Sequence, residues 1–246
     1  MNILMIGNIC NVGSNLKKGL EQFGHTVTIV DNPSVLHDDV ASYPLAWKGV
    51  VKSPWSSNDR FDIIHIHSPN MKKLGNCLGW LRRSRVVCHW HGSDLRHGWK
   101  AWPVYHWLLR FGSFHLYSTV DLAWWLRSVS NSKKCLFRCP VDTSVFKPNG
   151  NTRNGCIVFD GGAHSFNTHR IPHYRMPDEL NKYESVDIRN ADGLHESLLS
   201  VIGLEAASCG CRVVQYPWMT REWVKENASV MSQANQLLQI YKKVIG

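Results

Sequence analysis

The amino-acid sequence predicts an α/β protein whose strands form parallel sheets in two lobes. Three observations support this fold class. Short apolar runs alternate with helical patterns along the first half of the chain, as parallel sheets with crossover helices require. A stretch rich in Asn and Gly, 148–154, interrupts this pattern as a linker would. The 246 residues can bury two small cores, and no apolar run approaches the roughly 20 residues that span a bilayer.

The first residues are expected to form a strand, a loop, a helix and a second strand. Apolar residues 3–6 predict a short buried strand, the loop Gly7–Ser14 follows, and helical spacing over 16–23 precedes a strand at 26–30. This order predicts a βαβ unit with a right-handed crossover. The loop lacks GxGxxG spacing and so predicts no dinucleotide site. Its glycines still allow a close backbone approach to a ligand. Further strands are expected at 61–67, 85–91, 114–120 and 134–138, with short helices near 43–50 and at 123–126.

The first lobe is expected to span 1–148 and the second lobe 149–234. A C-terminal helix over 235–246 follows, with helical spacing of its apolar residues. Within the second lobe, strands are predicted at 156–160, 186–189 and 212–216, and helices at 177–183 and 200–208.

Glu205 is the one carboxylate in a predicted helix of small and apolar residues. Gly203, Ala206 and Ala207 would let this helix pack closely on a parallel sheet, as helices beside nucleotide sites do. A carboxylate on its exposed face could then bind both hydroxyls of a ribose. The alternative is a solvated glutamate on an amphipathic helix.

The chain carries 28 Lys and Arg against 19 Asp and Glu, a formal net charge of +9. This balance favours anionic partners such as nucleic acid, phosphorylated ligands or an acidic membrane face. No nucleic-acid-binding motif accompanies the charge, so nucleic acid is not the expected partner. Eight cysteines with no recognisable secretion signal indicate reduced thiols and a cytoplasmic protein, and their spacing is poor for structural zinc.

Polar clusters follow three of the predicted strands, at Gly7–Ser14, His65–Ser68 and His89–Asp94. Because ligands of parallel sheets gather at the carboxyl ends of strands, these are candidate binding residues. His91, which a glycine follows, could turn its imidazole into a cleft and hydrogen-bond a phosphate or a sugar hydroxyl. The alternative is that His91 bonds to local backbone and Asp94 caps a helix.

Histidines alternate on two of these predicted strands. His65 and His67 lie on one strand, and His89 and His91 lie on the next strand along the chain. Each pair faces one side of its strand and could supply two metal ligands. Since no third ligand at suitable spacing accompanies either pair in the sequence, a metal site is not expected.

A basic stretch, 164–173, follows the first strand of the second lobe. Arg170 could bind a diphosphate through its bidentate guanidinium, with His169 or His173 assisting. A solvated surface loop is the alternative. Asp160 and Glu196 are further carboxylates expected near this stretch, and for each a structural or solvated role is the competing interpretation.

Tryptophans and basic residues intermingle over 96–127, among them Trp99, Trp102, Trp124 and Arg127. Interfacial segments combine these residue types, and anionic lipid attracts them. Peripheral contact with an anionic membrane surface is therefore one expectation for this region. The alternative is that the tryptophans fill the core.

Four segments, in this order, resemble the retaining, nucleotide-sugar-dependent GT-B fold glycosyltransferases of family 4. They are Phe61–Ser68, Val87–Asp94, Pro140–Pro148 and Gly203–Gly210. The resemblance implies two Rossmann-like lobes with donor binding between them, a final helix that crosses back to the first lobe, and chemistry that needs no metal or other cofactor. The function it implies is transfer of a sugar to an acceptor, which the Trp-rich region suggests is lipid-linked or near a membrane.

The resemblance also implies roles for individual residues. Glu205 matches the glutamate that holds the donor ribose, and His91 matches the first-lobe histidine beside the transferred sugar. Gly13 lies in the loop similar to the Gly-rich loop beside the donor phosphates. Arg170 and His173 stand where the family has an Arg–Lys pair that neutralises the diphosphate. The remaining expected site residues are Ser14, Glu196 and Ser200 on the donor side and His67, Ser93 and Asp94 on the acceptor side.

The sequence departs from the family pattern in three respects. Ser197 stands where the family has its first glutamate, with Glu196 displaced by one position, and His173 replaces the lysine. Between Arg170 and the helix at 177 there is no room for the helix–strand–helix of relatives, so a compacted second lobe of three or four strands is expected. These departures favour the alternative of a catalytically degenerate module that binds a sugar nucleotide or scaffolds a partner.

Overall fold

The computed structural model describes most of the chain in two compact units. Unit 1 comprises Met1–Ser118, Leu122–Phe137 and Ala234–Gly246, and unit 2 comprises Thr119–Asp121 and Arg138–Gln233. The described residues are 1–8, 11–30, 61–67, 85–92, 95, 108–110, 112–160, 175–189, 201–214 and 216–246.

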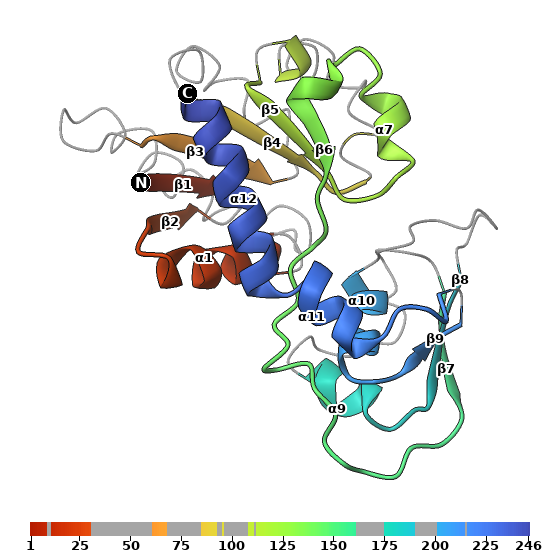
Figure 1. Ribbon diagram of the computed structural model, residues 1–246. Helices are drawn as coiled ribbons and strands as arrows, with labels where there is room; N and C mark the ends of the chain where they lie inside the picture. Colours follow the sequence, from red (N-terminus) through yellow and green to blue (C-terminus); the bar gives the residue numbers. More distant parts are fainter. Residues whose placement is uncertain are drawn as a thin grey trace, which may run out of the picture. The chain divides into compact units, whose positions relative to one another are not determined.

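Unit 1 is built on a six-stranded parallel sheet in the order β2-β1-β3-β4-β5-β6 (Figure 1). The predicted α/β class with a parallel sheet is confirmed, as is the opening β1–α1–β2 unit. The strands are β1 (Asn2–Ile6), β2 (Thr26–Val30), β3 (Ile63–His67), β4 (Val86–Trp90), β5 (Phe114–Tyr117) and β6 (Lys134–Leu136). The helical segments are α1 (Val12–Gln22), α7 (Leu122–Trp125) and a 3-10 turn at Asn131–Lys133.

The last two strands of this sheet are shorter than predicted. β5 ends at Tyr117, three residues before the expected end, and Val120 is largely exposed. The backbone N–H of Phe137 still donates to the carbonyl of Tyr117, so pairing continues one residue past β6. Ser118 and Thr119 after the strand are still buried, and only Val120 is exposed.

One face of the sheet carries an apolar core. Side chains of alternate strand residues meet there with Leu95, Leu108 and residues around α7. The indole of Trp90 is fully buried on this face, and its Nε1–H donates to Nδ1 of His115 at 3.2 Å. The strand residues of this cluster are Leu4, Ile6, Ile64, Ile66, Val86, Cys88 and Trp90.

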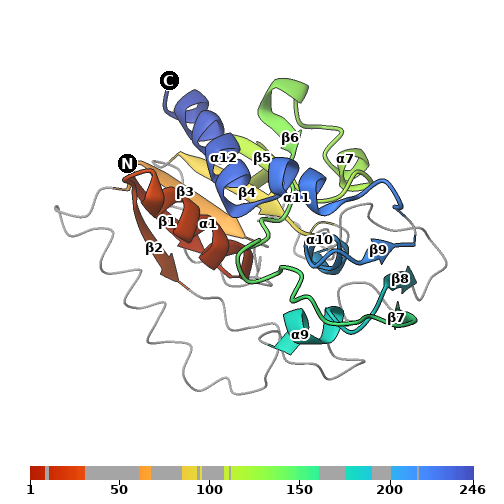
Figure 2. The ribbon, with the colours of Figure 1, turned by 60° about the horizontal axis from the view of Figure 1, so that its bottom comes forward.

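Helix α12 (Val230–Ile245) lies beside the sheet, and both Figure 1 and Figure 2 show it there in blue. The predicted helical spacing of the tail is confirmed, because Leu237, Leu238 and Tyr241 are buried. The helix begins five residues earlier than its predicted start at 235. From Ala234 on, the helix belongs to unit 1, and there Lys243 Nζ donates to the carbonyl of Ser132 at 2.9 Å.

Unit 2 contains a three-stranded parallel sheet in the order β7-β8-β9. Its strands are β7 (Cys156–Asp160), β8 (Ser185–Arg189) and β9 (Arg212–Val213), and its helices are α9 (Met176–Leu180), α10 (Val201–Ser208) and α11 (Arg221–Asn227). Helix α11 is not among the predicted elements. It begins after Thr220, whose hydroxyl oxygen accepts a hydrogen bond from the N–H of Trp223.

Two arginines hold the C-terminal end of α10 in unit 2. Arg153 Nη2 donates to the carbonyl of Cys209 at 2.5 Å and to Oδ1 of Asn181 at 2.6 Å. Arg221 Nη1 donates to the carbonyl of Ser208 and, at 3.0 Å, to that of Phe146. Cations at a helix C-terminus satisfy carbonyls that lack intrahelical partners. The 148–154 segment, expected to be a linker, is therefore tied into unit 2.

Within the described residues, no helix is long and apolar enough to cross a membrane.

Candidate functional site

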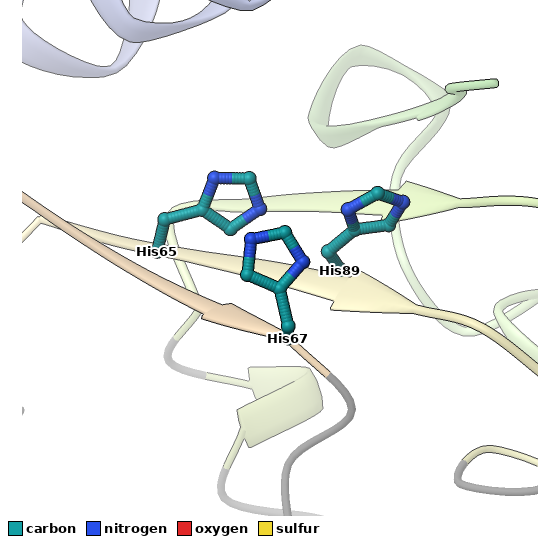
Figure 3. Close-up of side chains that lie close together, drawn as sticks. All are labelled: His65, His67 and His89. Carbon is teal, nitrogen blue, oxygen red and sulfur yellow. The ribbon is translucent and has the colours of Figure 1, made fainter. Parts of the chain in front are cut away.

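Four histidines gather on the face of the unit 1 sheet opposite the Trp90 core. In the parallel register of β3 and β4, His67 lies beside His89 and His65 lies beside Val87. Since side chains alternate along a strand, His65, His67, His89 and the following His91 project on the same side. The ring centroids of His65 and His67 are 4.2 Å apart, and those of His89 and His91 are 4.0 Å apart. Figure 3 shows the first three rings facing a common space.

Burial keeps the inner three histidines neutral. His65, His67 and His89 have at most 1% of their surface exposed. Desolvation lowers the pKa of His65 to about 3, with a further contribution from nearby His91. The same cause lowers the pKa of His67 and of His89 well below 6.5. At neutral pH each of these rings therefore carries one N–H donor and one nitrogen acceptor.

Hydrogen bonds connect the cluster to its surroundings. Nδ1 of His65 lies 2.6 Å from Oη of Tyr241 on α12. Nδ1 of His67 lies 3.3 Å from Nε2 of His91, whose Nδ1 lies 3.4 Å from Oγ of Ser118. Nε2 of His89 lies 3.1 Å from the same Ser118 hydroxyl. Both ring nitrogens of His91 thus have partners inside the cluster.

The second nitrogen of each inner ring stands apart from this network. Nε2 of His65, Nε2 of His67 and Nδ1 of His89 are buried and make no hydrogen bond with any described residue. One ring nitrogen from each of the three lies within 4.8 Å of the other two. In the sequence, neither pair of histidines has a third ligand at suitable spacing, and no metal site was expected. The register of β3 and β4 corrects that expectation, because it brings both pairs to one face of the sheet.

The loop between β1 and α1 is packed against itself. A Cβ at Gly7, whose φ is +90°, would lie 2.7 Å from the carbonyl oxygen of His67. A Cβ at Gly13 would lie 3.0 Å from the carbonyl oxygen of Gly7. The side chain of Asn8 accepts from the N–H of Ser14 at 2.9 Å and donates to its Oγ at 2.7 Å. Gly7 is therefore required by its φ and by the nearby His67 carbonyl, whereas a side chain at Gly13 would need only a small shift of its neighbours. Ser14 is exposed.

Glu205 is 3% exposed on α10, where Ile202 to Cys209 are all buried. The expectation of an exposed carboxylate is therefore wrong, and so is its alternative of a solvated side chain. A helix with small and apolar residues on every side is buried all round. A carboxylate enclosed in this way needs hydrogen-bond partners or a ligand, because its desolvation is costly.

The remaining expected site residues lie outside the described part of the chain. These residues are Arg170, His173, Glu196, Ser200, Ser93 and Asp94. The same holds for Ser197, His169 and the short helix expected near 43–50. Among the expected residues that are described, the structure brings together His67 and His91.

Part of the tryptophan and arginine region is described. Trp124 is 59% exposed, and the guanidinium of Arg127 lies 4.1 Å from the centroid of its ring. Trp125 packs against the apolar core beside β4 and β5. Trp125 thus agrees with the core-filling alternative, and membrane contact of the exposed Trp124 stays a prediction. Trp99 and Trp102 lie outside the described residues.

Sequence reasoning missed Tyr241 and Ser118 as partners of the histidines. Tyr241 is fully buried on α12, far from His65 in sequence, and only its helical spacing could have marked it as an inward residue. Ser118 follows β5 by one residue, so its place beside His91 depends on the strand order of the sheet.

No protein-family model matches the sequence, and a comparison with curated proteins also gives no match. Solved structures do match its fold. Sucrose-phosphate synthase of Thermosynechococcus elongatus has a TM-score of 0.67 and 12% identity, covering 99% of each chain. The chain has the fold of a glycosyltransferase.

Two further structures support this likeness. A glycosyltransferase of Rickettsia africae has a TM-score of 0.62 and 11% identity, covering 99% of this chain and 98% of that chain. HepE of Anabaena, solved in complex with UDP, has a TM-score of 0.55 and 11% identity, covering 99% of this chain and 100% of that chain.

Proposed function

We propose that this protein is a GT-B glycosyltransferase that moves a sugar from a nucleotide-sugar donor to an acceptor. The observation that carries the proposal is the fold likeness, which extends over 98% or more of both chains in three glycosyltransferases. One of those structures holds UDP, which is the product half of a UDP-sugar donor. The family resemblance of the sequence points to the same activity and to retention of configuration.

In this proposal Glu205 binds the hydroxyls of the donor ribose. The likeness of Gly203–Gly210 to the family's donor-binding segment supports the role, and the 3% exposure of Glu205 implies that the hydroxyls would be bound away from bulk water. Such an interaction is present in both the bound donor and the transition state, so it contributes to donor affinity more than to rate.

The reaction proposed passes through an oxocarbenium-like transition state as the diphosphate leaves. Arg170 and His173 would neutralise the charge on the leaving diphosphate, which is the electrostatic contribution that most favours such a step. His91 would hydrogen-bond the transferred sugar. No step in this scheme requires a metal ion. The acceptor side would be formed by His67, Ser93 and Asp94, and the exposed pair Trp124 and Arg127 supports an acceptor held at an anionic membrane surface.

A non-catalytic module that binds a sugar nucleotide is the second candidate. Two observations favour it. Both ring nitrogens of His91 have partners in the histidine cluster, and Ser14 is engaged by Asn8 within its own loop. A transferase of this kind would need these groups to change partners when the donor binds.

A panel of UDP-, GDP- and ADP-sugars separates the two candidates. For the enzyme, we expect one donor to raise the melting temperature and to be hydrolysed slowly without acceptor. Glu205→Gln should weaken that donor's affinity, whereas the control Glu222→Gln, an exposed residue on α11, should not. A melting shift without turnover identifies the binding module. No shift with any donor contradicts both.

A further inference from the structure

The unpartnered nitrogens of the histidine cluster form a candidate ligand set of their own. Three buried polar atoms, His65 Nε2, His67 Nε2 and His89 Nδ1, lie on one face of one sheet without a hydrogen bond to a described residue. Buried polar groups are normally paired, and an orphaned group is costly. Three such atoms within one cluster call for a common partner.

In each of the three rings, the nitrogen that has a hydrogen-bond partner, called here the outer nitrogen, makes the contact that holds a metal-binding histidine in place. The other nitrogen, called here the inner nitrogen, is the proposed ligand. Metal-binding histidines usually donate their other N–H to an oxygen or nitrogen acceptor, which fixes the tautomer and the ring orientation. Here Oη of Tyr241, Nε2 of His91 and Oγ of Ser118 lie within 3.3 Å of those outer nitrogens. If each outer nitrogen is the donor, the inner nitrogen of every ring carries a free lone pair.

We propose that His65, His67 and His89 bind a divalent transition-metal ion, and zinc fits best. The ligands are His65 Nε2, His67 Nε2 and His89 Nδ1, with water or hydroxide as the fourth ligand. Neutral imidazole is a preferred ligand of zinc, and three histidines plus one water is a known tetrahedral set.

The dimensions of the cluster allow this coordination. The ring nitrogens lie within 4.8 Å of one another. Zinc–nitrogen bonds of about 2.0–2.1 Å in a tetrahedron place ligand atoms about 3.4 Å apart, so the rings need to close by about 1–1.5 Å at most. The rings of His65 and His67 are stacked with an interplanar angle of 17°, so metal binding would require them to rotate, and Figure 3 shows that each ring already turns a nitrogen toward the others.

The ion would sit in a dry part of unit 1. All three ligand residues are fully buried. Burial disfavours the imidazolium form, so the neutral imidazole that a metal ion needs is the stable form. The net positive charge of a buried ion with neutral ligands is reduced when the bound water ionises, which for zinc occurs near pH 7. All three ligands belong to unit 1, and bound metal can be measured whether or not the protein transfers sugar.

Metal content and spectroscopy test the inference directly. The full chain is produced in zinc-supplemented medium, passed through chelating resin and measured for bound metal. We expect stoichiometric zinc, and X-ray absorption should show nitrogen or oxygen ligands at about 2.0–2.1 Å with the outer-shell scattering of imidazole. Protein produced with Co²⁺ should show the intense visible bands of a tetrahedral site.

Matched variants locate the site. His67→Gln should lose the metal, whereas His115→Gln, which changes an equally buried histidine on the opposite face of the sheet, should retain it. If His67→Gln fails to fold, the wild-type absorption spectra still decide. Absence of bound metal, sulfur ligands in the X-ray spectrum, or full metal content in folded His67→Gln would each overturn the proposal.

Discussion

The two faces of the unit 1 sheet are both buried, yet they are chemically unlike. One face packs Ile66, Cys88 and Trp90 into an apolar core, where a single imidazole, His115, accepts from the indole. The other face presents His65, His67 and His89 from the same two strands. The first face has one buried polar atom, His115 Nε2, that makes no hydrogen bond with a described residue. The second face has three such atoms close together, and such a departure from the rules of a core marks a place where function is to be sought.

Acidification should cause the largest change in the free energy of unfolding. It tests whether the histidine face is more sensitive to protonation than the apolar face. Burial lowers the pKa of His65 to about 3 and that of His115 to about 4, and lowers those of His67 and His89 well below 6.5. Below about pH 6.5 the unfolded chain therefore binds protons that the folded chain does not. The free energy of unfolding should have its full value above that pH. As the pH is lowered further, it should fall by up to about 1.4 kcal/mol per pH unit for each buried histidine.

Urea unfolding with EDTA present, between about pH 6.5 and 5, measures this slope above the range where Asp and Glu titrate. His115→Leu should remove one histidine's share and leave that of the other face. A free energy of unfolding independent of pH across this window would show that the buried rings are not neutral in the folded state.

Truncation of a large side chain on the apolar face should lower the free energy of unfolding by less than protonation of all the buried histidines together. It should lower it by more than either of the other two substitutions below. Trp90→Ala deletes the largest fully buried side chain and leaves His115 Nδ1 without its indole donor. We expect a loss of about 3–5 kcal/mol in the free energy of unfolding. Urea titration at pH 7.5 measures it, and a loss of under about 1 kcal/mol would contradict the tight packing of this face.

Removal of one hydroxyl on the histidine face should have a smaller effect. Tyr241→Phe deletes the partner of His65 Nδ1 and leaves that nitrogen buried without its hydrogen bond. A loss of about 1–3 kcal/mol is expected for metal-free protein. Tyr183→Phe, which deletes a half-exposed hydrogen bond to Glu179 in unit 2, is the control and should cost much less. Equal losses of unfolding free energy in the two variants would show that the buried contact with His65 stabilises the protein no more than an ordinary, partly exposed hydrogen bond.

The smallest effect is expected at an aromatic residue outside both faces. Trp124 is exposed, so Trp124→Ala should change the free energy of unfolding by less than about 0.5 kcal/mol. The same variant should lower binding to vesicles containing phosphatidylserine if this tryptophan and Arg127 contact a membrane. Unchanged vesicle binding would remove the membrane from the proposed acceptor side.

The sequence was sufficient to predict most strands and to single out several candidate residues. It was insufficient to predict which of those residues lie next to one another. Apolar runs such as 63–66 and 86–88 predicted buried strands because burial on both faces leaves a local signature. The histidine cluster needed the register of β3 against β4 and the placement of Tyr241 on α12, both of which are long-range facts. Glu205 was singled out correctly as unusual, but its burial depends on everything packed around α10 and could not be read from the helix itself.

Unit 1 is assembled from three separate stretches of chain, and the last of them, Ala234–Gly246, brings Tyr241. During synthesis on the ribosome, β1 to β6 emerge well before that segment, whereas Arg138–Gln233 of unit 2 is continuous. His65 therefore lacks its Tyr241 partner, and unit 1 lacks its last segment, until the final helix has been translated.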